Sequence, residues 1–138
     1  MKFLLDTNIC IYIINNRFEG SISWIKNAGI ENVCVSSISV AELEFGITKS
    51  TKFDETQTAL YKFLSGFNLI DFDAVAARSY GRIRADLQSK GNIIGAMDML
   101  IAATAISNEM ILVSNNVGEF SRVNGLKIEN WVETPPKI

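Results

Sequence analysis

The chain has 138 residues, a formal net charge of −2 and no histidine, and 48% of its residues are hydrophobic. A chain of this size and apolar content has enough material for one hydrophobic core and too little for two. Its weak negative charge gives no sign of an overall basic nucleic-acid binder, and the absence of histidine excludes histidine-based acid–base catalysis and the triads built on it.

Apolar runs typical of short strands alternate with helical patterns along the chain. In chain order we expect a strand at 3–6, helices at 9–15 and 22–27, a strand at 33–36, helices at 40–48 and 53–64, a strand at 69–72, helices at 74–89 and 96–108, a strand at 111–114, a short helix at 117–122 and a strand at 126–128. Strands that alternate with helices predict an α/β fold in which helices cover both faces of a parallel sheet.

Two helix starts carry capping signals. Thr7 or Asn8 is expected to cap the first helix. Ser39 lies three residues before Glu42, which is the spacing of a capping box, so we expect it to open the helix that follows.

The sequence shows no internal repeat, low-complexity tract or linker, so we expect a single domain over residues 1–132 and a short tail at 133–138. Asp6 comes too early for a signal peptide, and no apolar run reaches membrane-spanning length. Cys10 and Cys34 fit buried small hydrophobic residues better than a disulfide. We therefore expect a cytoplasmic protein with no membrane contact.

Four acidic side chains fall where a parallel sheet places its ligand crevice, outside the carboxyl ends of its strands. Asp6 follows the first apolar strand, and Glu119 follows the apolar run that ends at Ser114. Glu42 and Asp98 each interrupt an apolar helical stretch, so helical spacing turns them toward the core side. A favourable charge at a helix N-terminus would explain either one alone, but together with Asp6 they need a cation, because an unpaired buried carboxylate is costly.

The acidic residues offer only oxygen ligands, and this decides which cation fits. Zinc prefers nitrogen and sulfur, whereas oxygen ligands suit Mg²⁺ or Mn²⁺. A metal held by Asp6 and Asp98 can activate water for in-line attack on a phosphodiester, and with a second ion Glu42 would bridge or orient that water. Such hydrolysis needs no protein nucleophile and predicts 5′-phosphate and 3′-hydroxyl ends.

Positive charge gathers on one predicted helix, which carries Arg78, Arg82 and Arg84 and is followed by Lys90. These cations form either a solvated helix face, with pairs such as Arg82 and Asp86, or a contact surface for phosphate. The sequence favours neither interpretation.

Five segments of the chain, in their order and spacing, resemble the VapC branch of the PIN-domain ribonucleases. They are residues 4–8, 36–43 with Gly46, 94–98 with 100–103, 113–116 with 119, 120, 122 and 123, and 125–126 with 129–131. The resemblance runs from Lys2 to Trp131 and implies a three-layer α/β/α PIN-like fold with a five-stranded parallel sheet. It also implies a divalent-metal-dependent endoribonuclease that acts as the toxin of a bacterial toxin–antitoxin pair.

Transferred residue by residue, the resemblance implies an acidic site at Asp6, Glu42 and Asp98. Many PIN domains have a further aspartate just after the late strand, where this chain has Asn116. Either Glu119, one helical turn further on, supplies a fourth catalytic carboxylate through a metal-bound water, or the site holds one ion firmly and a second only when substrate is present. Asn116 can still offer a carbonyl oxygen to the metal.

Two polar residues beside the first aspartate have a supporting role in this interpretation. Thr7 and Asn8 are expected to orient Asp6 through hydroxyl and amide hydrogen bonds, or only to cap the strand end.

The resemblance further implies two partners, an RNA substrate and a VapB-like antitoxin that covers the acidic crevice. Structured RNA, and tRNA in particular, is the first substrate to consider. The alternative function is a non-catalytic PIN-like domain that binds RNA or protein, in which Asn116 would mark a degenerate metal site.

Two predicted helices contain more large apolar residues than one buried stripe needs. These residues are Ile11, Tyr12, Ile14, Leu60, Tyr61, Phe63 and Leu64. We expect some of them to form the contact of a two-fold homodimer, as in the resembled family; the alternative is that all of them serve the monomer core.

Overall fold

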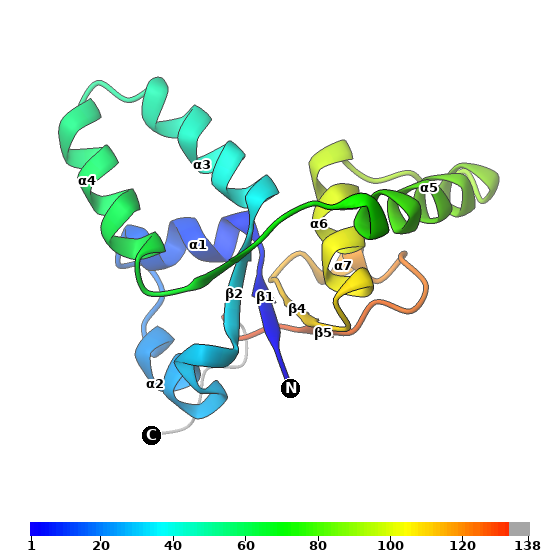
Figure 1. Cartoon of the computed structure of the whole chain (residues 1–138), viewed down its shortest axis with the longest axis horizontal. Helices are drawn as coiled ribbons and strands as arrows, with labels where there is room; N and C mark the ends of the chain where they lie inside the picture. The colour runs from blue at the N-terminus through cyan, green and yellow to red at the C-terminus, as the bar shows by residue number, and fades with distance from the viewer. Residues whose placement is uncertain (133–138) are drawn as a thin grey trace.

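The computed structural model describes residues 1–132, and a five-stranded parallel sheet lies at the centre of the molecule (Figure 1). The strands are β1 (Phe3–Leu5), β2 (Val33–Ser36), β3 (Asn68–Ile70), β4 (Ile111–Val113) and β5 (Ile128–Glu129). They lie in the order β3-β2-β1-β4-β5, and every neighbouring pair is parallel. The strand order therefore reverses beside β1, and the carboxyl ends of β1 and β4 flank the position where such sheets bind ligands.

Helices cover both faces of this sheet. They are α1 (Thr7–Ile14), α2 (Ser21–Ala28), the 3₁₀ helix η1 (Ile30–Asn32), α3 (Ser37–Thr48), α4 (Phe53–Leu64), α5 (Ala74–Ser89), α6 (Ala96–Ser107) and α7 (Val117–Phe120). In Figure 1, α1 to α4 lie on one side of the strands and α5 to α7 on the other. The predicted α/β fold of three layers with a five-stranded parallel sheet is confirmed.

Two apolar clusters fill the space between the layers, because neighbouring side chains of a strand point to opposite faces. Leu4 and Leu112 belong to the cluster under α5 and α6, whereas Leu5 and Val113 belong to the cluster under α1, α3 and α4. All four side chains are fully buried, and each burial stabilises the fold by roughly 1.5–3 kcal/mol. Residues of β1 and β4 are thus fixed from both sides of the sheet, and so are the residues that follow them.

Most predicted elements have bounds close to the observed ones, and α4 and α5 match them residue for residue. The last strand is an exception, since β5 begins at Ile128 rather than at residue 126, and η1 was not predicted. The predicted tail at 133–138 lies outside the described residues. None of the helices in residues 1–132 is long and apolar enough to cross a membrane.

Both predictions about helix caps are wrong. Helix α1 begins at Thr7 and is capped by Asp6, whose side chain accepts a hydrogen bond from the backbone N–H of Ile9. Helix α3 begins at Ser37 and is capped by Ser36, which accepts from the backbone N–H of Ser39. Each helix begins within two residues of the end of its strand, so the residue just before the helix, Asp6 after β1 and Ser36 at the end of β2, becomes the cap.

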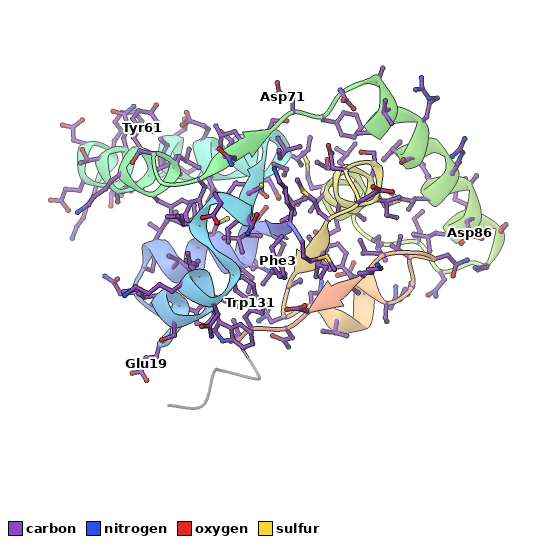
Figure 2. All side chains as sticks on the ribbon, turned by 60° about the horizontal axis from the view of Figure 1, so that its bottom comes forward. Phe3, Glu19, Tyr61, Asp71, Asp86 and Trp131 are labelled. Atoms are coloured by element: carbon purple, nitrogen blue, oxygen red, sulfur yellow. The ribbon has the colours of Figure 1, made fainter. Side chains whose placement is uncertain are left out.

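Three aromatic rings pack together around Trp131, near the end of the described residues. Trp131 is 1% exposed, lies 5.4 Å from Phe3 between ring centroids (Figure 2), and stacks on Trp24 at 5.2 Å. Cys10 and Cys34 are buried and free, as predicted. Because Phe3 begins β1, this group of rings contacts the amino end of that strand, whereas Asp6 follows its carboxyl end.

Candidate active site

A cavity of about 280 Å³ opens at the carboxyl edge of the sheet, where the strand order reverses. Its lining comes from the β1–α1 junction, α3, α6 and the turn after β4, and consists of Asp6, Thr7, Asn8, Ile11, Glu42, Asp98 and Asn116. Six of these seven residues were predicted for the site, and Ile11 was not. The structure therefore brings together residues that lie up to 110 positions apart in the sequence.

Asp6 lies at the closed end of the site and is 4% exposed. Its Oδ1 accepts from the backbone N–H of Ile9 at 2.9 Å, and its Oδ2 accepts from the Ser114 hydroxyl at 2.5 Å. Burial raises the pKa of Asp6, the bonds from Ser114 and Ile9 oppose this shift, and the charge of Glu42 adds to it. Ser114 is itself fully buried, so it fixes the orientation of Asp6.

Thr7, which was expected to orient Asp6, holds Glu42 instead. The Thr7 hydroxyl donates to Oε1 of Glu42 at 2.6 Å and lies 2.9 Å from the Ser39 hydroxyl. The prediction that Thr7 orients Asp6 is therefore wrong, because α1 turns the Thr7 side chain toward α3. Asn8 lines the cavity with an exposed side chain, and its predicted role remains a prediction.

Asp98 lies in the first turn of α6, which has no side-chain cap. Burial, followed by the charges of Glu119, Asp6 and Glu42 in that order, raises its pKa to about 6. In the described part of the chain the one ion pair joins Lys90 to Asp86, and neither residue lines the cavity. The carboxylates of the site therefore have no ion pair with a basic side chain. A site with this charge attracts cations.

Glu119 lies behind the cavity lining. Its Oε2 accepts from the Asn116 side-chain amide at 2.5 Å, and its Oε1 accepts from the backbone N–H of Gly95 at 3.3 Å. Glu119 thus joins α7 to the turn before Asp98. The amide nitrogen of Asn116 is used in this bond, which leaves its carbonyl oxygen as the atom that it can offer to a cation.

The donor atoms of the cavity fit a hard divalent cation, since carboxylate, amide carbonyl and hydroxyl oxygens are what Mg²⁺ and Mn²⁺ prefer. In residues 1–132, however, no three Asp, Glu or Cys side chains converge closely enough to hold an ion as they stand. Asp6 and Glu42 are each drawn onto a neighbouring hydroxyl instead. The fit therefore rests on the donor chemistry and on the uncompensated negative charge.

Two hydroxyl-bearing residues at the site were missed by the sequence analysis. Ser114 binds Asp6, and Ser39 binds Thr7. Ser114 directly follows a strand, as Asp6 does, and this position was the available signal. Ser39 had been assigned to a helix cap, which obscured its contact with Thr7.

Comparison with known proteins connects this site to one family. The PIN domain model matches residues 3–126. The chain is 42% identical to ribonuclease VapC2 of Rickettsia felis, over 95% of this chain and 98% of that protein. It is 40% identical to the tRNA(fMet)-specific endonuclease VapC of Shigella flexneri, over the same shares of the two chains. The crystal structure of VapBC2 from Rickettsia felis bound to a DNA fragment from their promoter contains a chain that superposes with a TM-score of 0.89 at 40% identity, covering 94% of this chain and 98% of that one.

Proposed function

Because this chain belongs to the VapC branch of the PIN-domain family, we propose that it is a Mg²⁺- or Mn²⁺-dependent endoribonuclease and the toxin of a toxin–antitoxin pair. The observation that carries this proposal is that Asp6, Glu42 and Asp98 line one open cavity and that no described ion pair joins them to a basic side chain. Neighbouring carboxylates without a basic partner repel one another, and a bound cation relieves this repulsion.

In this proposal, Asp6, Asp98 and Glu42 hold the metal, with the carbonyl oxygen of Asn116 as a further ligand. When bound, the ion would supply an activated water and would neutralise charge that develops on the phosphate. Ser114 keeps Asp6 aimed into the cavity, and Thr7 does the same for Glu42. Glu119 holds Asn116 and the turn before Asp98 in place, and its carboxylate raises the pKa of Asp98.

The test of this activity is cleavage of RNA by the purified chain, followed by analysis of the new ends. In Mg²⁺ or Mn²⁺ we expect internal cuts with 5′-phosphate and 3′-hydroxyl ends, because water is the nucleophile. In EDTA we expect no cuts, because the metal ion is removed. A cyclic 2′,3′-phosphate would contradict the proposal, since it requires attack by the RNA itself. Binding without any cleavage would support the non-catalytic alternative with a degenerate site.

We propose a structured RNA, first of all a tRNA, as the substrate, supported by the printed name of the Shigella flexneri relative. Arg78, Arg82 and Arg84 are exposed on α5 and could contact phosphates beyond the cut. The predicted pairing of Arg82 with Asp86 is not the one observed, because Asp86 pairs with Lys90 at 3.0 Å near the far end of α5 (Figure 2). Arg84 donates one guanidinium N–H to the Tyr80 hydroxyl at 2.9 Å, and each of the three exposed guanidinium groups still has donors to offer to phosphate.

We propose a VapB-like antitoxin as the second partner, supported by the complex solved for the Rickettsia felis relative. An apolar groove of about 240 Å³ runs between α1, α3 and α4 and shares Ile11 and Glu42 with the acidic cavity. An amphipathic segment in this groove could extend a basic side chain onto the carboxylates, where a guanidinium would replace the metal.

We also propose a homodimer, although fewer of the named apolar side chains are exposed than the sequence suggested. Of the seven apolar residues named for it, only Ile11 and Tyr61 are exposed, at 36% and 50%, and Leu60 is buried in the monomer. Phe53 adds a further exposed ring at the start of α4. Light scattering at micromolar concentration tests the proposal: we expect about twice the chain mass of 15.3 kDa, and a value near that mass would rule out the dimer.

A further inference from the structure

A chain of side-chain hydroxyls leads from the end of β2 to Glu42. The Ser36 hydroxyl lies 3.4 Å from that of Ser39, the Ser39 hydroxyl lies 2.9 Å from that of Thr7, and the Thr7 hydroxyl lies 2.6 Å from Oε1 of Glu42. Ser36 and Ser39 are fully buried, so solvent cannot take the place of either one. Four groups from three elements thus form one connected path.

The acceptor at the end of this path fixes the direction of every bond in it. Glu42 accepts from the Thr7 hydroxyl, so Thr7 uses its single proton in this bond. The contact between Thr7 and Ser39 then requires the Ser39 hydroxyl to donate. Ser36 already accepts from the backbone N–H of Ser39 at 3.1 Å and directs its own proton to the Ser39 oxygen, over a distance that makes this the weakest bond.

The Ser39 hydroxyl has partners of another kind than the hydroxyls of Ser36 and Ser37. Ser36 caps the helix, and Ser37 accepts from the backbone N–H of Phe72, so both hydroxyls satisfy backbone groups. Within residues 1–132, the hydrogen bonds of the Ser39 hydroxyl go to the side-chain oxygens of Thr7 and Ser36 and to no backbone group. A role in the architecture of the helix therefore does not account for its position, whereas a role toward Glu42 does.

We propose that Ser39 is a positioning residue for Glu42, acting through Thr7. By donating to Thr7, Ser39 fixes the Thr7 side chain and strengthens the bond from Thr7 to Glu42, so that one carboxylate oxygen is held and the other is presented to the cavity. This inference rests on the proposed function, in which Glu42 contributes to the metal site.

The experiment is a titration of the purified full-length chain with Mn²⁺ alone, followed by electron paramagnetic resonance. We expect Ser39→Ala to weaken Mn²⁺ binding by about 10-fold, the lower end of the range for residues that orient metal ligands. Thr7→Val should weaken it at least as much, while Thr7→Ser, which keeps the hydroxyl, should bind like the wild type. The matched control is Ser37→Ala on the same helix, which should change thermal stability but not Mn²⁺ affinity.

A double-mutant cycle separates positioning from a general structural effect. In a Glu42→Gln background, Ser39→Ala should cause no further loss of Mn²⁺ affinity, because the group that it positions is gone. An unchanged affinity in Ser39→Ala, or a loss of the same size in both backgrounds, would overturn the inference while leaving the metal site intact. An unchanged affinity in Glu42→Gln would instead overturn the assignment of Glu42 to the metal site, and this inference with it.

Discussion

Asp6→Asn is expected to abolish RNA cleavage and to leave the fold intact. Asn keeps the shape of the side chain and can still accept from Ile9, so the cap of α1 is preserved, but it removes the charge that attracts the metal. Since residues that merely orient metal ligands typically cost up to about 100-fold when they are replaced, the loss of a ligand itself should cost at least that much. The measurement is the initial rate of cleavage with saturating Mg²⁺, compared with that of the wild type.

The other acidic residues supply graded controls for this result. Glu42→Gln and Asp98→Asn should also abolish cleavage, because both residues line the cavity. Glu119→Gln should be milder, since Glu119 acts through Asn116 and Gly95. Full activity of any of the first three variants would show that the acid is misassigned, and a normal rate for Glu119→Gln would make Glu119 an ordinary surface residue with no part in cleavage.

Thermal unfolding in EDTA shows whether a loss of activity comes from unfolding. The pKa of Asp98 is raised from 3.8 to about 6 in the folded chain, so the folded state binds more protons than the unfolded state between those values. The free energy of unfolding of the metal-free protein must then fall as the pH rises through this window. Asp98→Asn has no carboxyl group at this position and does not lose this free energy. Near neutral pH it should therefore unfold at the same temperature as the wild type or at a higher one. The difference in unfolding temperature should shrink as the pH is lowered. Solvent screening keeps the effect small, because Asp98 is only half-buried.

The layout of the fold and the position of the site could be predicted because both follow from local patterns. Apolar runs buried on both faces marked the strands, and the carboxyl end of β1 marked the edge where Asp6 lies. The periodicity of α6 indicated that Asp98 turns inward, and the structure places it in the cavity lining. Such signals lie within one element or at its end, so the sequence alone contains them.

The hydrogen bonds inside the site could not be predicted, because they depend on how elements pack against one another. Thr7 was assigned to Asp6 on the grounds of adjacency, yet α1 packs against α3 and brings it to Glu42. Ser114 reaches Asp6 across 108 positions because β1 and β4 are neighbours in the sheet. A serine also has many possible partners in a sequence, whereas a buried carboxylate has few, which is why the acids were found and the hydroxyls that hold them were not.

Growth arrest is the expected result of expressing this chain in a bacterial host without its antitoxin. A nuclease that cuts a structured RNA needed for translation would stop growth even at low abundance, because each enzyme molecule turns over many substrates. The acidic cavity and the adjoining apolar groove are accessible in residues 1–132, so substrate can reach the carboxylates. The measurement is the optical density after induction, with sequencing of RNA ends from the same cultures.

The matched control for growth arrest is Asp6→Asn, expressed to the same soluble level. This variant should restore growth, because it keeps the surface of the protein and loses only the charge at the metal site. Arrest that persists with Asp6→Asn would point to toxicity from binding or aggregation rather than from cleavage. Normal growth with abundant soluble wild-type protein would contradict the toxin function outright.

If the wild type arrests growth, a co-expressed VapB-like partner should relieve the arrest. Glu42 borders both the acidic cavity and the apolar groove. Substitution of Glu42 should therefore weaken the binding of a basic antitoxin side chain in the cavity.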